Sequence, residues 1–464
     1  MIDDLPFDKI IQASMRHGAD FADVFVERTR TTMISCDDKR IEHAAVSSDA
    51  GVGIRVVKEG RTAYGSTNDL TRKSLMALAR DVGKMAGARR VKVPAPKLIE
   101  TEATRVVTVQ RHPFGIPMDE KCMIVTRANE IAWQAGKEVR QAKILYRDRV
   151  RRIWVAGSDG TYATDEQAGI VLSAHVVAGD GGSLETGQEV IGGAQGFEIF
   201  DEITPEEVAD RAARRAILML SARPAPAGSM PVVIAAEAGG TMIHEAVGHG
   251  LEADLAGEGL SVYSRRIGEK VASDLITVVD DATMSGKRGS FTFDDEGERA
   301  RRNVLIERGV LKSYMSDRRS SKKYSLARTG NGRRQNYEHL PICRMTNTLI
   351  MPGRHDPKEI VRSTHTGLYV KRMGGGQVNT VNGDFVFNVQ EGYLIRDGKI
   401  AEPVRGATLI GNGPRVLESI DMVGKDLGFS VGTCGKEGQE APVSCGQPTL
   451  RIPAIVVGGT AINC

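Results

Sequence analysis

The chain of 464 residues lacks the long apolar segments that membrane proteins require. No run of about 18 or more apolar residues occurs, so a membrane-spanning helix is not expected. The first residues, Met1-Ile2-Asp3-Asp4-Leu5, also lack the basic-then-apolar pattern of a secretory signal. With 41% apolar residues, the chain can still bury the cores of about two or three domains. We therefore expect a globular protein of the cytoplasm with no membrane partner.

Cysteine is scarce, and no two cysteines form a C-x-x-C pair. In a chain without a secretion signal, scattered cysteines are expected to be reduced thiols. One of them can still be a soft metal ligand. The six residues are Cys36, Cys122, Cys343, Cys434, Cys445 and Cys464.

An excess of one charge is also missing, because 62 Lys and Arg residues face 59 Asp and Glu residues for a net charge of +3. No global field steers such a chain toward nucleic acid, and no nucleic-acid-binding motif is present. The densest basic run covers residues 147–152, where Arg147, Arg149 and Arg151 would share one face of a strand. We expect this face to be solvated rather than to follow phosphates.

Apolar periodicity and turn signals predict an α+β fold. A mixed α/β N-terminal domain is expected at residues 1–225, followed by a β-rich C-terminal catalytic domain at residues 226–464. A helix is expected over residues 205–220, and residues 221–228 are the expected linker. Short helices are expected near residues 317–326 and 356–363. Hairpin turns are expected at Asp159-Gly160, Arg308-Gly309, Asn382-Gly383 and Asp397-Gly398.

The strongest chemical signal is the segment HEAVGH at residues 244–249, which follows the pair Gly239-Gly240. Neutral imidazoles hold divalent ions, and a nearby carboxylate can take a proton from a metal-bound water. The segment therefore predicts a metal site in which His244 and His249 are ligands and Glu245 is the general base.

The spacing of the two histidines differs from the common H-E-x-x-H pattern by one residue. At about 100° per residue, His244 and His249 would point about 140° apart on a regular α-helix. Both can face one ion only if the helix widens to an i→i+5 turn or breaks before His249. Gly248 and Gly250 make either distortion easier.

A catalytic zinc site usually has three protein ligands plus water, so one ligand is missing from this segment. Cys434 is attractive because the turn Gly432-Thr433-Cys434-Gly435 would let a thiolate approach an ion without crowding. Spacing alone, however, favours an ordinary half-buried thiol. The candidates are Glu252, Asp254, Glu269, His339, His355, Cys434 and Cys445.

Several segments together resemble the TldD/PmbA family of metalloproteases. They are HEAVGH at 244–249, TGNGRR at 329–334, MTNT at 345–348, GGGQVN at 374–379 and CGK at 434–436. The resemblance runs through essentially the whole chain and is densest after Gly239. It implies that His244, His249 and Cys434 bind zinc and that Glu245 is the general base. Cys445 departs from the family pattern, so its part in metal binding stays open.

The resemblance also implies partners. In that family a metal-bearing subunit pairs with a paralogous subunit that lacks the histidine motif, and this chain resembles the metal-bearing kind. We therefore expect a heterodimer with a PmbA-type paralogue or a homodimer.

The expected reaction is hydrolysis of a peptide bond. Glu245 would accept a proton from zinc-bound water as it attacks the carbonyl, and would then deliver that proton to the leaving amine. The negative tetrahedral oxygen needs one fixed donor besides the ion. Arg333 or Arg334 can supply it, although a structural ion pair is the commoner role of such residues.

A glycine-rich segment is the expected substrate-binding element, through Gly374, Gly375, Gly376 and Asn379. It lacks the G-K-[ST] ending of a phosphate loop and precedes a strand-like stretch. Glycines there would let an unfolded peptide add as a strand, whereas a simple bulge explains the pattern equally well. Strand addition mainly uses the peptide backbone, so it predicts loose sequence preference.

A non-catalytic alternative is a peptide-binding or structural zinc subunit of a complex. A structural zinc site is closed by four protein ligands, so participation of Cys445 beside Cys434 favours this alternative. Loss of cleavage with metal retained in Glu245→Gln favours the enzyme.

Overall fold

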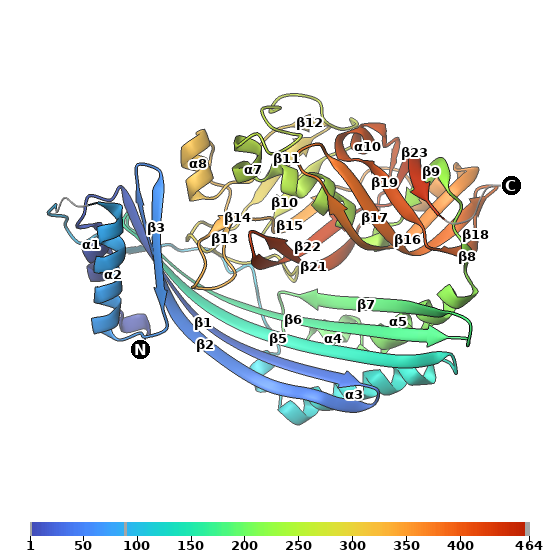
Figure 1. Cartoon of the computed structure of the whole chain (residues 1–464), viewed down its shortest axis with the longest axis horizontal. Helices are drawn as coiled ribbons and strands as arrows, with labels where there is room; N and C mark the ends of the chain where they lie inside the picture. The colour runs from blue at the N-terminus through green and yellow to red at the C-terminus, as the bar shows by residue number, and fades with distance from the viewer. Residues whose placement is uncertain (1, 88–90, 460–464) are drawn as a thin grey trace.

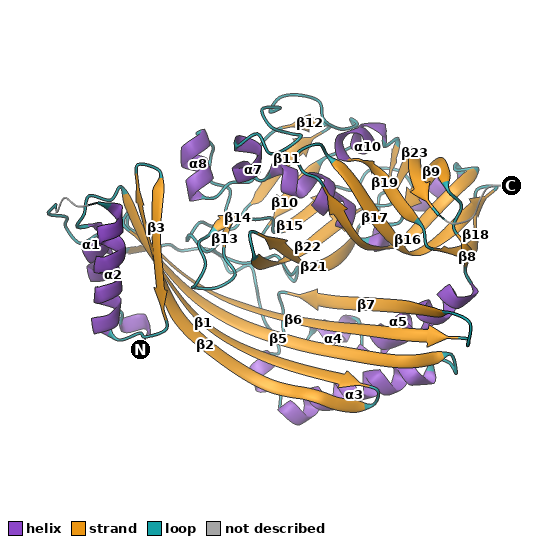
Figure 2. Ribbon diagram, viewed as in Figure 1, coloured by secondary structure: helices purple, strands orange, loops and turns teal. Residues whose placement is uncertain are grey.

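A computed structural model describes residues 2–87 and 91–459 of the chain. Figure 1 shows a long curved sheet from the N-terminal half, with helices along its outer face and the C-terminal half on its other side. Strands dominate both halves, as Figure 2 shows. This architecture confirms the predicted α+β fold with a β-rich C-terminal region. Among the described residues, no helix is long and apolar enough to cross a membrane.

The N-terminal sheet has seven strands in the order β3-β2-β1-β5-β6-β4, with β7 paired to β6. The predicted hairpin at Asp159-Gly160 is confirmed, since it joins β5 to β6 and Gly160 has a φ of +92°. The strands are β1 (Phe21–Asp37), β2 (Arg40–Lys58), β3 (Arg61–Thr67), β4 (Ile99–Glu100), β5 (Val139–Gly157), β6 (Thr161–Gly179) and β7 (Leu184–Gly193).

Helices cover the outer face of this sheet. The predicted helix after residue 204 is confirmed as α5: the Thr204 hydroxyl accepts from the Glu207 amide while the Glu207 carboxylate accepts from the Thr204 amide. Its buried stripe, which includes Val208 and Ala212, packs against α3 and the sheet. The helices are η1 (Ile2–Asp4), α1 (Phe7–Met15), α2 (Arg72–Ala86), η2 (Pro113–Gly115), α3 (Met118–Gln134), α4 (Ile199–Glu202) and α5 (Pro205–Ser221).

The inner face of the sheet is not the solvated surface expected from the arginine run. Along β5, Ile144 and Tyr146 face the helices, whereas the arginines alternate onto the opposite face. The side chains of Arg149 and Arg151 are only 29% and 8% exposed. Arg151 bonds Asp295 of the C-terminal half at 2.7 Å. The expectation was wrong for Arg149 and Arg151, because a second part of the chain covers them, whereas Arg147 is exposed as expected.

The C-terminal half contains two larger sheets and one small one. In the eight-stranded sheet, β16 pairs with both β9 and β17, which closes five strands into a ring. Its strands are β8 (Arg223–Pro224), β9 (Gly228–Ile234), β16 (Thr366–Val378), β17 (Asp384–Arg396), β18 (Lys399–Arg405), β19 (Thr408–Asn412), β20 (Met422–Val423) and β23 (Leu450–Gly458). Within the expected linker, β8 pairs with β18, so this segment is anchored to the C-terminal half.

The six-stranded sheet has the order β12-β11-β10-β15-β22-β21, which leaves β21 at one edge. Its strands are β10 (Val278–Asp281), β11 (Arg302–Glu307), β12 (Val310–Leu311), β15 (Asn347–Ile350), β21 (Gly428–Lys436) and β22 (Gln439–Gln447). The small sheet pairs β13 (Gly332–Arg333) with β14 (Ile342–Cys343). The three C-terminal hairpin turns are confirmed, with positive φ at Gly309, Gly383 and Gly398.

Short helices connect these sheets. The two expected ones are confirmed as α8 and α9, whose first turns are capped by the carboxylates of Asp317 and Asp356. The helical segments are η3 (Ala236–Ala238), α6 (Thr241–Ile243), η4 (His244–Gly248), η5 (His249–Leu251), α7 (Ala253–Gly257), α8 (Arg318–Tyr324), α9 (Pro357–Arg362) and α10 (Gly413–Ser419).

Candidate metal centre

The histidine segment forms a distorted helix. Its first turn is α-helical, η4 is a π-helical turn, and η5 is a tight 3₁₀ turn. The His249 amide donates to the His244 carbonyl, an i→i+5 bond. The sequence-based prediction of a widened turn is therefore confirmed. The two imidazole rings come to lie 5.1 Å apart between centroids.

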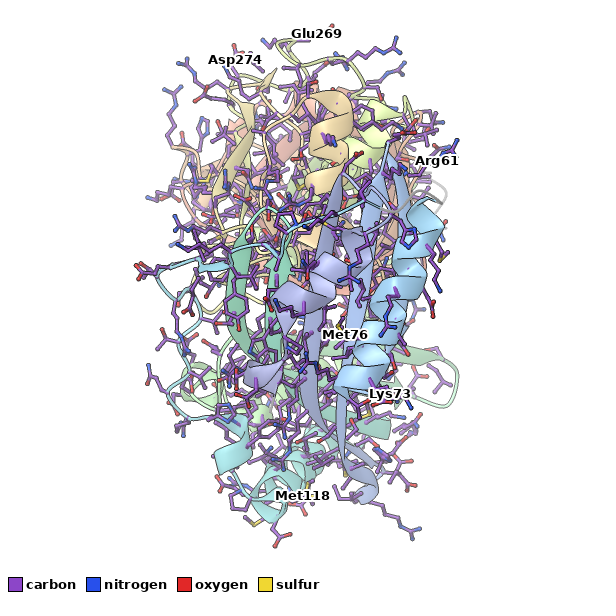
Figure 3. The ribbon with its side chains drawn as sticks, turned by 90° about the vertical axis from the view of Figure 1, so that its left-hand side faces the viewer. Arg61, Lys73, Met76, Met118, Glu269 and Asp274 are labelled. Atoms are coloured by element: carbon purple, nitrogen blue, oxygen red, sulfur yellow. The ribbon has the colours of Figure 1, made fainter. Side chains whose placement is uncertain are left out.

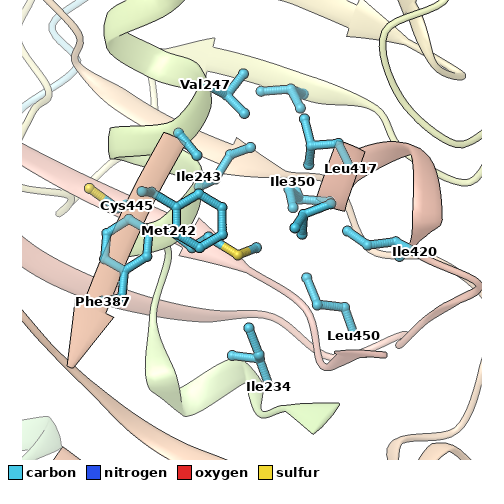
Figure 4. Packing of buried hydrophobic residues seen from close by; sticks show 14 of the residues in the cluster. Ile234, Met242, Ile243, Val247, Ile350, Phe387, Leu417, Ile420, Cys445 and Leu450 are labelled. Carbon is cyan, nitrogen blue, oxygen red and sulfur yellow. The ribbon is translucent and has the colours of Figure 1, made fainter. Parts of the chain in front are cut away.

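Apolar packing holds this helix in place. Met242, Ile243 and Val247 are at most 2% exposed and point into the C-terminal core, as Figure 4 shows. Gly248 lies so close to Met345 that an added Cβ would sit 2.0 Å from the thioether sulfur. The apolar side of the helix thus fixes the position of its polar side, which faces a cavity.

The structure brings His244, His249 and Cys434 together. One possible ligand atom from each lies within 4.8 Å of the others, and Cys434 Sγ is 3.3 Å from His249 Nε2. Cys434 comes from the edge strand β21, where buried Arg344 donates to its carbonyl. Cys445 on the neighbouring strand β22 lines the same cavity.

The other candidate ligands from the sequence lie elsewhere. Glu269 sits at the outer edge of the C-terminal half, as Figure 3 shows, and pairs with Arg266. His339 bonds Asn336, and His355 bonds the backbone of residue 423. These three side chains take no part in the His-His-Cys cluster.

The charges of the cluster suit a metal ion. Burial opposes the thiolate of Cys434, but hydrogen bonds from His244 and His249 lower its pKa to about 5. Burial also opposes imidazolium formation, but the Glu252 carboxylate and Cys434 raise the pKa of His249 to about 9. His244 Nδ1 is buried without a hydrogen-bond partner. A thiolate and two imidazoles within reach of one point form a donor set that fits zinc.

A buried ion network supports His249 from behind. Its Nδ1 donates to Glu252 at 2.9 Å, and Lys436 Nζ lies 3.0 Å from the same carboxylate oxygen. Lys436 also bonds both carboxylate oxygens of Asp254 at 2.7 Å. Burial raises the pKa of Glu252, but Lys436 and then His249 bring it down to about 2. This network fixes the ring so that Nε2 faces Cys434.

The cluster opens into a cavity of about 360 Å³. Glu245 lines it, is half-buried, and has no hydrogen-bond or ion-pair partner among the described residues. Arg372 also lines it and pairs with Glu189 of β7, so the N-terminal half supplies one wall. The cavity thus places a carboxylate without a structural partner beside the His-His-Cys cluster.

Arg333 and Arg334 do not line this cavity. Arg333 donates to the carbonyls of Met345 and Pro442, and Arg334 bonds Asp295. Both arginines therefore have a structural role, which was expected to be commoner than stabilising the tetrahedral oxygen. The charged donor that the cavity does contain is Arg372.

The glycine-rich segment lies just beyond this cavity. Arg372 and Met373 line the wall, whereas Gly374, Gly375, Gly376 and Asn379 continue β16 into the turn before β17. Register shifts in this stretch form the bulge that was one of the two expectations. Gly376 is needed for packing, since an added Cβ would meet the Phe387 ring at 1.9 Å.

The cysteines are free thiols where the structure describes them, namely Cys36, Cys122, Cys343, Cys434 and Cys445. This confirms the expectation of reduced thiols for these five. Cys464 lies outside the described residues.

Comparisons with known proteins agree with this architecture. Models of PmbA/TldA metallopeptidase domain 1, the central domain and the C-terminal domain match residues 22–86, 111–220 and 227–459. The metalloprotease TldD homolog of Haemophilus influenzae is 37% identical, with 97% of this chain and 95% of that protein covered. The zinc metalloprotease TldD homolog of Saccharolobus solfataricus is 29% identical, with 97% and 99% covered.

A solved structure shares the fold. TldE from Thermococcus kodakarensis superposes with a TM-score of 0.73 at 19% identity, covering 95% of this chain and 97% of that one. The family models span nearly all of the sequence, and the Haemophilus relative matches along 95% of its length. The chain therefore belongs to the PmbA/TldD metallopeptidase family.

Proposed function

We propose that this chain is a zinc-dependent peptidase that cleaves extended or unfolded peptides. The observation that carries the proposal is the convergence of His244, His249 and Cys434 beside the unpartnered carboxylate of Glu245 in one cavity. The two imidazoles and the thiolate would hold the ion. Bound zinc would supply Lewis-acid chemistry, polarising a peptide carbonyl and making water a stronger acid.

Glu245 would move the proton in this reaction. Its carboxylate lines the cavity next to His244 and is free of any ion pair with the described residues, so it can accept a proton from water. The same carboxyl would return that proton to the leaving amine. Arg372, held by Glu189, would offer positive charge to the carbonyl oxygen of the substrate.

The proposed substrate is an extended backbone because strand edges surround the cavity. β21 and β7 are edge strands, and both contribute wall residues. A peptide can bond to such an edge as an added strand. We extend this binding surface to Gly374, Gly375, Gly376 and Asn379 at the end of β16.

Alanine at Gly375 tests the contribution of β16. An added Cβ there meets no atom within 4 Å, so the fold should tolerate it. If a peptide backbone packs against this glycine, kcat/KM for an unfolded peptide should fall by about tenfold. Gly115→Ala is the matched control, since Gly115 is equally open and lies in η2. Unchanged cleavage in Gly375→Ala would remove β16 from the substrate site.

Zinc affinity is expected to rise with pH between about 5 and about 9, the pKa values of Cys434 and His249. His249 has a raised pKa of about 9 and carries a proton at neutral pH, whereas zinc needs the neutral imidazole. The Cys434 thiol, with a pKa of about 5, has already lost its proton. Each proton displaced from an imidazole makes the apparent affinity rise by about tenfold per pH unit. Competition with a chelator at several pH values measures this slope, and a flat profile would contradict it.

A structural zinc site is the competing function. Cys445 lines the same cavity as Cys434. Burial opposes imidazolium formation at His244, but the charge of Cys445 and then hydrogen bonding with Cys434 raise the pKa of His244. Four protein ligands would leave no open position for catalysis. Zinc content measured together with peptide cleavage separates the two functions.

We also propose that the chain works in the cytoplasm as a dimer, with either a PmbA-type paralogue or a second copy of itself. The likeness in fold to TldE supports a paralogous partner. Light scattering of the purified chain, alone and mixed with a paralogue, distinguishes the two assemblies.

A further inference from the structure

A second cavity lies between the two halves of the molecule. It has a volume of about 310 Å³, and its lining comes from β1, β5 and β6 on one side and from the β21–β22 hairpin on the other. Five arginines line it, against three acidic residues. The arginines are Arg147, Arg149, Arg151, Arg288 and Arg333, and the acidic residues are Glu27, Asp49 and Glu440.

The positive charges of this cavity are incompletely matched. Glu27 pairs with both Arg149 and Arg151 at 3.0 Å, and Arg151 also pairs with Asp295 at 2.7 Å. By contrast, Arg288 and Arg333 donate only to backbone carbonyls and one hydroxyl, with no carboxylate among the described residues within 4 Å. Arg333 is buried and Arg288 is half-buried, and a guanidinium group withdrawn from water without a carboxylate is costly, so an incoming anion would be stabilised here.

Two further observations point to a ligand rather than to structure. Arg147 lines the cavity and is exposed, and its side chain makes no hydrogen bond or ion pair with the described residues. The Arg151 side chain is only 8% exposed, and its Nη2 is buried without a hydrogen-bond partner. Burial and then the charges of Arg147 and Arg149 lower the pKa of Arg288 to about 10, so these groups crowd one another.

The second cavity adjoins the metal centre. Arg288 donates to the carbonyl of Gly432 and to the hydroxyl of Thr433 at 3.0 Å. Thr433 lines both cavities and directly precedes Cys434. Successive residues of a strand point to opposite faces, so the two cavities lie on the two sides of the edge strand β21. A peptide bound along this edge would have groups within reach of both.

We propose that the arginine-lined cavity binds a carboxylate of the peptide substrate, supplied by its C-terminus or by an Asp or Glu side chain within a few residues of the cleaved bond. Five arginines face three acidic residues in the lining, and Asp295 outside the lining pairs with Arg151, so about one positive charge is left, which suits a single carboxylate better than a dianion. This inference rests on the proposed peptidase function and adds a preference for acidic or C-terminal segments to it.

The test measures binding rather than cleavage. Four versions of one fluorescent, disordered peptide carry either Glu or Gln near the cleaved bond and either a free or an amidated C-terminus. Their affinities for the zinc-loaded Glu245→Gln variant are compared by fluorescence anisotropy. Removing the recognised carboxylate should weaken binding by about tenfold, as expected for a charge-assisted contact. Which of the two substitutions has this effect identifies the source of the carboxylate.

Arginine variants connect the preference to the cavity. Arg147→Gln removes a charge that pairs with no other described residue, so the fold should be unaffected. The ratio between the affinities of the peptides with and without the recognised carboxylate should shrink by about threefold or more. Arg152→Gln is the control on the opposite, exposed face of β5 and should keep the full ratio. The inference is overturned if all four peptides bind alike or fail to bind, or if the preference survives Arg147→Gln combined with Arg288→Gln. A preference observed without any cleavage by the unmodified chain would instead refute only the peptidase proposal.

Discussion

Replacing Glu245 with glutamine is expected to lower kcat/KM for an unfolded peptide by about 10²- to 10⁴-fold while zinc stays bound. Glutamine keeps the size of the side chain but cannot accept a proton from water. The residue has no hydrogen-bond or ion-pair partner among the described residues, so the fold and the ligands should not change. Peptide cleavage followed by chromatography, with zinc measured by mass spectrometry, gives both quantities.

Glu237→Gln is the matched control for this experiment. Glu237 is an exposed glutamate in η3, shortly before the histidine segment, and does not line the cavity. Its variant should cleave at the rate of the unmodified chain. A Glu245→Gln variant with full activity would show that another group moves the proton. Loss of zinc from that variant would show that Glu245 supports the ligands.

Local features were predictable because short-range geometry determines them. The five-residue spacing of His244 and His249 requires a widened turn if both rings are to meet, and the i→i+5 bond is present. Turns at Gly309, Gly383 and Gly398 need a positive φ that glycine adopts without strain. Each of these predictions depends on a few neighbouring residues.

The set of residues around the ion depends on distant pairing. Cys434 and His249 are 185 positions apart, and Cys434 reaches His249 from β21, a strand that is paired with β22. Spacing could not choose among seven candidates. The flanking glycines made Cys434 attractive, but only the family resemblance selected it. Glu252 was considered as a ligand, whereas the structure places it behind His249.

Two signals in the sequence could have revealed that Glu252 and Lys436 support His249. Glu252 follows His249 by three residues, a spacing that puts two side chains on one helical face. Lys436 follows Cys434 by two residues, which places it on the same face of a strand. The arginine run of β5 shows the limit of such arguments. Alternation predicted one shared face, but it could not show that the C-terminal half covers that face.

Replacing Cys434 with serine is expected to reduce bound zinc from about one ion per chain to a small fraction. The Cys434 thiolate, with a pKa of about 5, supplies the negative charge of the cluster, and a serine hydroxyl stays protonated at neutral pH. Loss of a direct ligand should cost more affinity than the roughly 10- to 100-fold effect of an outer-shell change. Zinc content after dialysis against a weak chelator measures the loss, and His249→Ala should behave in the same way.

Cys445→Ser is the control that decides how this site is built. If Cys445 is a bystander, its variant keeps zinc and activity, because the three ligands and an open position remain. If Cys434→Ser and Cys445→Ser each lose the ion, two sulfurs and two imidazoles close the site, and the structural zinc function is favoured. If only Cys445→Ser loses zinc, the ligand is the sulfur of β22, and the contact between Cys434 and His249 at 3.3 Å has another purpose. Only the first result leaves both a free coordination position and Glu245 beside it, which is what hydrolysis requires.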